Sequence, residues 1–309
     1  MAHRPGHRAR ALPEARVEIG RTLWLDLTLA GLITGGMYAL VAVGLNLQYG
    51  LMRVMNIAHG EFLMVGAYLA YWAYTLTGVS PLLTLPAVFV ALFLIGLLVF
   101  RLCFRRIARA SPSVEVLEAR SLLVGFGLMF LIQNGAYLAW GADLRGYEYL
   151  ARPVEIAGAR FGANRLVVFA FAVGVSLVLL ALLRFTLFGK AVRAMMQSPR
   201  GAQLVGIDVG LLHPVVFGVG LALAGVAGAL LSMIYEISPA MGEPYTVTAL
   251  IVITLGGLGS APGSLLGGLL LGLVETYGTH VSNPSMKMLL SYGVFVLVLI
   301  LRPRGLFAR

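Results

Sequence analysis

A short polar segment between two apolar stretches holds residue types that could do chemistry inside a membrane. Residues 46–61, NLQYGLMRVMNIAHGE, place amide, imidazole, guanidinium and carboxylate groups among methionine, isoleucine, valine and leucine. Charged groups at membrane depth are expensive and tend to face a protein interior or a watery path. Two interpretations stay open for this segment, an ordinary surface loop and a half-buried turn beside a pathway.

Four residues of this segment are candidates for shaping a pathway: Asn56, His59, Gly60 and Glu61. His59 and Glu61 are two positions apart and cannot share a helix face, so they do not predict a metal site. We expect His59 to cap or orient the turn, and Glu61 to pair with Arg53 if the chain folds back. A structural role in the turn is favoured over direct contact with a substrate.

Two long apolar runs are interrupted by small residues. The interruptions are Gly31, Gly35 and Gly36 in residues 23–47, and Gly256, Gly257, Gly259, Pro262 and Gly263 in residues 246–275. Broken segments in corresponding positions of two halves point to a transport site near the membrane midplane. The same pattern is also typical of helices that merely cross closely, because small residues let two backbones approach. Both interpretations stay open.

The basic segment 188–207, FGKAVRAMMQSPRGAQLVGI, predicts a short helix over residues 190–197. The Ser198–Pro199 pair ends that helix, and a second turn follows over 202–205. Val192, Met195 and Met196 fall along one side of the first helix. Exposed Met and Val side chains would make a docking surface for a partner. The alternative is an amphipathic helix on the anionic inner leaflet.

Composition indicates what elements must position these residues. Of 309 residues, 59% are hydrophobic and only 12% are charged, with a mean hydropathy of +0.90 and 38 glycines. Soluble domains carry about 25% charged residues, so the chain is predicted to be an all-α polytopic membrane protein. We expect eight to ten transmembrane or re-entrant helices, two Gly-broken segments and an internal pseudo-repeat. The apolar stretches cover residues 23–47, 60–78, 81–103, 121–140, 166–187, 213–235, 246–275 and 286–301.

The basic residues predict which side of the membrane each loop faces. The net charge is +10, and 17 of the 23 basic residues lie in residues 1–22, 101–120 and 184–208 and at the C-terminus. The positive-inside rule places these regions in the cytoplasm, and the mixed-charge segment 141–165 outside. Residues 1–22 are read as a short, mobile cytoplasmic tail, and both termini are expected to be cytoplasmic. Topology thus explains most of the charge, and nucleic acid is not an expected partner.

Counting crossings then produces a conflict. Residues 24–103 and 211–302 each contain three apolar stretches, yet both ends of each region are predicted to be cytoplasmic. An odd number of crossings cannot return to its starting side. We therefore expect one re-entrant or split stretch in each half.

Several absences in the sequence exclude an enzyme. The chain contains no G-x-x-x-x-G-K-[ST], no H-E-x-x-H and no G-x-S-x-G, and Cys103 is its single cysteine. No catalytic residue, metal or cofactor is therefore expected. Asp26, Glu236 and Glu275 lie near the ends of apolar stretches and are expected at the headgroup level. Without an acidic residue in mid-span, a stand-alone ion-coupled carrier is the weaker alternative.

Four segments resemble the permease subunits of branched-chain amino-acid ABC importers. Residues 38–68 resemble the N-terminal signature of that family, whose N-[FI]-A-H-G-E core is intact as residues 56–61. Residues 189–207 are similar to its cytoplasmic coupling loop, 253–272 to its second Gly-rich signature, and 302–307 to its C-terminal ending. The resemblance covers about residues 23 to 309.

The resemblance implies a permease domain over residues 23–309 with a coupling loop at 188–208. It implies a second, non-identical permease subunit, two ATP-binding cassette subunits and a periplasmic binding protein, assembled in the bacterial inner membrane. The ATPase contacts would be Gly189, Lys190, Arg193, Ala194 and Gly206. The importer would carry branched-chain or related amino acids into the cytoplasm. Relatives that carry urea or short amides remain an alternative within the family.

Overall fold

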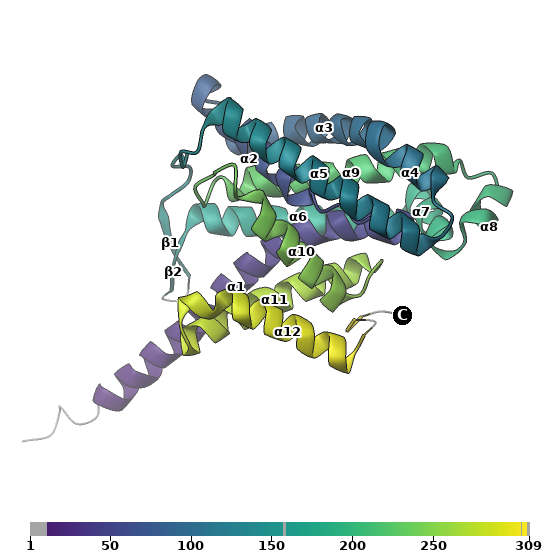
Figure 1. The fold of residues 1–309 in the computed structure, drawn as a ribbon. Coiled ribbons are helices and arrows are strands. Elements are labelled where there is room, and N and C mark those ends of the chain that lie inside the picture. The colour runs from purple at the N-terminus through teal and green to yellow at the C-terminus, as the bar shows by residue number, and fades with distance from the viewer. Residues whose placement is uncertain (1–10, 157–158, 304, 308–309) are drawn as a thin grey trace, which may run out of the picture.

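A computed structural model describes residues 11–156, 159–303 and 305–307, and it shows a bundle of helices with one small hairpin (Figure 1). The first half contains α1 (Ala11–Met52), α2 (His59–Thr77), α3 (Pro81–Val99), a π-helical turn (Phe100–Phe104), α4 (Arg105–Ala110) and α5 (Val114–Trp140). The antiparallel strands β1 (Pro153–Ile156) and β2 (Ala159–Gly162) follow. The second half contains α6 (Ala163–Phe185), α7 (Leu187–Gln197), α8 (Pro199–Leu204), α9 (Val209–Leu231), α10 (Gly242–Gly256), α11 (Ala261–Val281), a 3-10 turn (Pro284–Met286) and α12 (Lys287–Leu301).

The centre of the bundle is formed by α9 and α1. Other parts of the chain bury 83% of the most apolar 18-residue stretch of α9. They bury only 11% of the corresponding stretch that contains α12. The apolar side chains of α3, α5, α6 and α12 therefore remain largely exposed, as in a protein whose outer face contacts lipid or another subunit. An all-α membrane fold is confirmed, although the sequence did not predict the β1–β2 hairpin.

The number of spanning helices is lower than expected. Six helices in the described residues are long and apolar enough to cross a membrane, and the count rises to seven only if the bent pair α10–α11 is one span. By this measure, which leaves out re-entrant helices, the count is below the expected eight to ten. α2 is not among the seven, because His59, Glu61 and its four tyrosine and tryptophan residues lower its hydropathy.

The two ends of the described chain lie at opposite ends of the bundle (Figure 1). In the first half of α1, Thr28 shares a hydrogen bond of 2.6 Å with Tyr277, close to the end of α11. At the other end of the chain, the Leu306 amide donates to the Leu255 carbonyl at 2.8 Å, beside the start of α11. This arrangement contradicts the prediction that both termini share one side. Residues 11–22, predicted as part of the tail, continue α1; residues 1–10 lie outside the described part of the chain.

The same arrangement removes the conflict in the number of crossings. α1, α2 and α3 lead from one end of the bundle to the other without a re-entrant stretch, so the start of α1 and the end of α3 lie at opposite ends (Figure 1). In the second half, α10 and α11 meet at 115° across a short break, so this pair returns to the end at which it began. The predicted break in residues 246–275 is therefore confirmed.

The predicted break in the first apolar run is wrong. α1 is continuous from Ala11 to Met52, and its glycines serve close helix packing instead. A Cβ atom on Gly35 would lie 2.7 Å from both the Gly268 carbonyl oxygen and the Leu269 Cα of α11. The glycines of this run therefore serve a close helix crossing. Because only one of the two segments is broken, the expected internal pseudo-repeat loses its basis.

Replacing Gly35 with valine is expected to lower the free energy of unfolding by about 3 kcal/mol, because the added side chain meets the α11 backbone, which cannot rotate away. Gly127→Val on α5 is the matched control, since a Cβ there meets nothing within 4 Å. Thermal unfolding of the two variants in detergent measures the difference. Equal midpoints would show that α1 and α11 do not pack this closely.

Candidate functional site

The polar turn after α1 folds back into the bundle. α1 ends at Met52, Arg53 adopts a positive φ of 54°, and the chain then reverses so that His59 Nε2 lies 3.1 Å from the Val41 carbonyl oxygen. His59 is completely buried, and this contact joins the turn to α1. The surface-loop interpretation is therefore wrong for this histidine.

The expected pair between Glu61 and Arg53 does not form. The Arg53 guanidinium donates to the Tyr49 hydroxyl at 3.3 Å and lies over the Tyr49 ring. Glu61 is fully buried in the first turn of α2, and neither of its carboxylate oxygens has a hydrogen-bond partner among the described residues. The side-chain amide group of Asn56 is also buried without a hydrogen-bond partner among the described residues. Buried polar groups are normally paired, so this cluster differs from ordinary core packing.

Gly60 brings the beginnings of α2 and α10 into contact. Its amide donates to Thr246 Oγ1 at 2.8 Å. A Cβ atom on Gly60 would overlap the Gly242 carbonyl oxygen and would lie 2.5 Å from Thr246 Oγ1. Only glycine allows this approach. As a result, Glu61 lies against Gly242 at the N-terminus of α10, in a place that the sequence pattern did not identify.

The break between α10 and α11 is built from the predicted small residues. α10 ends at Gly256, and Gly257 and Gly259 have φ values of 99° and 84°, which favour glycine. Pro262 lies in the first turn of α11, where proline is well tolerated. Gly256 and Gly263 face each other so closely that a Cβ on either would overlap the backbone of the other.

Asn46 of α1 holds this break in place. Its Nδ2 group donates to the Gly257 carbonyl at 3.2 Å, to the Ser260 carbonyl at 2.9 Å and to Ser264 Oγ at 2.5 Å, while its Oδ1 accepts from the Gly259 amide at 2.5 Å. One buried side chain thus satisfies backbone groups on both sides of the bend. The signal in the sequence was an asparagine within an apolar run, but its partners are more than 200 positions away.

The basic segment forms the helices α7 and α8, at the same end of the bundle as the break (Figure 1). Thr186 caps α7 by accepting from the Gly189 amide at 3.1 Å, and a Cβ on Gly189 would overlap the Leu183 carbonyl. Lys190 and Arg193 are exposed, and Ala194 is half-buried. Gly206 follows α8 with a φ of 88°.

The apolar side of α7 faces inward rather than outward. Val192 and Met195 are at most 1% exposed, so the predicted docking surface of methionine and valine on α7 is wrong. Met196 lies between α1 and the break: a Cβ on Gly50 would be 2.7 Å from Met196 Cε and 2.8 Å from Gly259 Cα. α7 therefore contacts the α10–α11 break directly.

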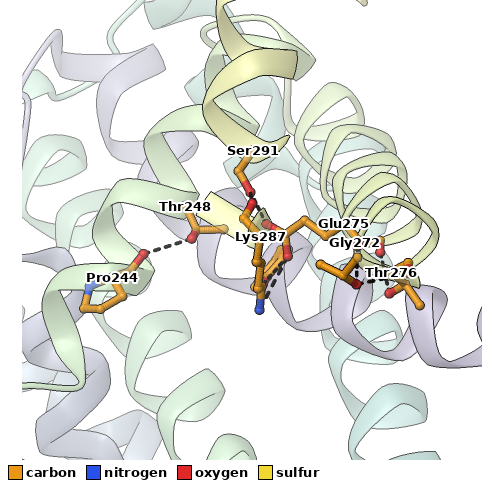
Figure 2. Close-up of polar contacts among 9 residues, drawn as sticks. Pro244, Thr248, Gly272, Glu275, Thr276, Lys287 and Ser291 are labelled. Carbon is orange, nitrogen blue, oxygen red and sulfur yellow. Dashed lines mark hydrogen bonds and ion pairs between the residues drawn. The ribbon is translucent and has the colours of Figure 1, made fainter. Parts of the chain in front are cut away.

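The structure also assembles a charged group that the sequence analysis missed. Glu275 was expected at the headgroup level, but it is 4% exposed and lies inside the bundle. It accepts from the Tyr38 hydroxyl of α1 at 2.7 Å and from the Ser291 hydroxyl of α12. Lys287 Nζ lies 3.5 Å from its Oε2 atom. Figure 2 shows Lys287 and Ser291 of α12 converging on this carboxylate of α11.

Comparisons with known proteins identify the family of this chain. The family described as branched-chain amino acid transport system / permease component matches residues 27–299. The permease protein BraD of the high-affinity branched-chain amino acid transport system of Pseudomonas aeruginosa is 30% identical over 302 residues, covering 93% of this chain and 96% of BraD. The corresponding LivH protein of Escherichia coli is 28% identical over 294 residues, covering 90% of this chain and 94% of LivH.

A second permease protein of the same Escherichia coli system, LivM, is 26% identical over 304 residues, covering 87% of this chain and 67% of LivM. No solved structure matches this chain significantly. The family match extends over the polar turn, α7, the break and Glu275. This chain belongs to the family of permease components of branched-chain amino acid transport systems.

Proposed function

We propose that this chain is a permease subunit of an ATP-driven importer that carries branched-chain or related amino acids across the inner membrane into the cytoplasm. The family match and the names of the relatives support the transport role. The match to both LivH-type and LivM-type proteins supports a second, non-identical permease as partner. Two ATP-binding cassette subunits and a periplasmic binding protein complete the proposed assembly.

The contact between α7 and the α10–α11 break is the observation that carries the proposal. An importer must transmit the movement of its ATPase subunits to the helices that surround the solute. Met196 packs between Gly50 of α1 and Gly259 of the break, and Asn46 ties the break to α1. A displacement of α7 would therefore reach both α1 and the α10–α11 break.

The surface proposed for the ATPase lies on α7, α8 and the residues just after them. Since Val192 and Met195 are buried, the exposed apolar side chains available to a partner are Leu187, Leu204 and Val205, which are 81%, 89% and 76% exposed, and the last two are adjacent in the chain. The same two helices carry three exposed cations, Lys190, Arg193 and Arg200. In this proposal the end with α7, α8 and the C-terminus is cytoplasmic, in agreement with its basic loops.

Replacing both Leu204 and Val205 with glutamate is expected to abolish ATP-driven uptake, because fully burying a Leu or Val side chain in an interface contributes about 2 kcal/mol, and burying a carboxylate there is unfavourable. Leucine uptake by membrane vesicles, together with copurification of the ATPase subunits, measures the effect. Gln203→Glu is the control, because it adds a negative charge to the same helix without removing an apolar side chain. Normal copurification and uptake in the double variant would refute this docking surface.

A stand-alone ion-coupled carrier is the second candidate, and one observation favours it. Two carboxylates, those of Glu61 and Glu275, lie buried within the bundle, although no acidic group was expected in mid-span. The two functions differ in their energy source. Uptake that stops when the ion gradient is collapsed, yet continues without ATP, would establish the carrier and overturn the importer; the opposite result is expected.

A further inference from the structure

Lys287 occupies an unusual position for a cation. It is the first residue of α12, where the helix dipole disfavours positive charge. Its side chain is 52% exposed, whereas that of its partner Glu275 is 5% exposed. The ammonium group thus lies at the boundary between the buried carboxylate and the outer face of the bundle, and its nitrogen is 5.7 Å from the centre of the Tyr38 ring.

Glu275 does not need Lys287 for its hydrogen bonds. Its two oxygens already accept from the Tyr38 and Ser291 hydroxyl groups, so the lysine supplies charge and has N–H groups to spare. The distance of 3.5 Å between Nζ and Oε2 is that of a loose ion pair. The remaining protons of the ammonium group are therefore available to a second acceptor on its exposed side.

The charge of this group suits a zwitterion. Glu275 and Lys287 together carry no net charge, and neither does an amino acid with its ammonium and carboxylate groups. An amino acid that binds Lys287 through its carboxylate brings its own ammonium group, so the net charge of the group stays at zero, which limits the cost of bringing charge into a region of low polarity. A purely anionic solute would lack this balance.

From this geometry we propose that the Lys287 ammonium binds the carboxylate of the amino acid that enters from the end of the bundle opposite α7, and that Glu275 positions this ammonium. The inference rests on the proposed transport of amino acids, and it adds the group of the solute that is recognised. Tyr38 and Ser291 act through Glu275, because both donate to its carboxylate.

The chain offers a direct test, because it contains only two lysines, Lys190 and Lys287. In the Lys190→Arg variant, reductive methylation with ¹³C-formaldehyde labels Lys287 as its single lysine while keeping the positive charge. The N-terminal amine is labelled as well. Its signal is identified in the Lys190→Arg/Lys287→Arg variant, which contains no lysine. The full labelled chain in nanodiscs is then titrated with leucine and with leucinol, which lacks the carboxylate.

Leucine is expected to shift the Lys287 NMR signal saturably, and leucinol to need at least about tenfold higher concentration, a factor typical of losing one charged contact. Equal shifts with both compounds, or no shift with leucine, would overturn the carboxylate site. Parallel uptake measurements separate the two proposals. ATP-driven uptake without a leucine-specific shift refutes only this site, while a specific shift without ATP dependence refutes only the importer.

Uptake by charge variants gives a second readout. Lys287→Met is expected to lower the rate of leucine uptake at least about tenfold, and Lys287→Arg to retain most of it. Because Lys287→Met leaves Glu275 without its counter-ion, Lys287→Met/Glu275→Gln serves as the structural control, since the glutamine amide can accept from one of the two hydroxyl groups of Tyr38 and Ser291 and donate to the other. Recovery of uptake in this double variant would show a merely structural ion pair and contradict the inference; a folded but inactive double variant supports it.

Discussion

Replacing Asn46 with leucine is expected to destabilise the α10–α11 break by about 2–4 kcal/mol and to abolish transport. Leucine has a similar volume but cannot replace the contacts that Asn46 makes with Gly257, Gly259, Ser260 and Ser264. The carbonyl and amide groups of the break would then be buried without this partner, which costs more than the loss of an ordinary hydrogen bond. Unfolding in a denaturing detergent and leucine uptake measure the two effects.

The natural control for this change is Asn134→Leu. Asn134 lies on the exposed face of α5, where its Nδ2 group donates to the Phe130 carbonyl of its own helix at 2.8 Å. Asn46→Asp adds a finer comparison, because it keeps the acceptor for the Gly259 amide but removes the donors to three oxygens. If the Asn46→Leu variant unfolded at the same detergent concentration as the Asn134→Leu variant and transported leucine normally, Asn46 would have no role in holding the break.

Gly60→Ala is expected to have an effect of comparable size, a loss of about 3 kcal/mol or more together with the loss of uptake. Even a single methyl group at this position would overlap the Gly242 carbonyl oxygen, and both backbones lie at the ends of helices that are packed on other sides. The start of α10 must then move away from α2, and the contact between the Gly60 amide and Thr246 is lost. The yield of monodisperse protein and its thermal midpoint report the destabilisation.

Gly135→Ala on α5 provides the matched methyl group, because a Cβ there meets nothing within 4 Å. Alanine also favours a helix over glycine, so this control should be neutral or slightly stabilising. A Gly60→Ala variant that equals it in both stability and uptake would mean that α2 and α10 do not meet in the working protein.

The sequence located the two sites but misjudged how their residues are arranged. The polar turn was recognisable because Asn56, His59 and Glu61 interrupt apolar residues, yet the expected Glu61–Arg53 pair is wrong. Local spacing cannot show that Gly60 packs against Gly242, about 180 positions later. For the same reason Asn46 was seen as one polar residue among several, although it is the residue that spans the α10–α11 break.

Glycine patterns illustrate the same limit. Glycines at Gly31 and Gly35 and at Gly256 and Gly257 look alike in sequence, but the first pair lies in a continuous helix and the second ends one. The difference is conformational: Gly257 adopts a positive φ, and the proline and serine that follow start a new helix with its own cap. Small residues permit both a close crossing and a break, and only the neighbouring helix decides which occurs.

What the sequence determined by itself is what depends on composition and local periodicity. A high apolar content and few charges require spanning helices, since every backbone polar group must be satisfied within the membrane. Those properties gave the all-α fold and the position of α7 and of the break, whereas the family followed from the motifs that the chain shares with known permeases. The tertiary structure alone decided the direction of α1, the burial of Val192 and Met195, and the meeting of Tyr38, Glu275 and Lys287. These features depend on contacts between residues far apart in the chain, whose free energies act only after the helices have packed.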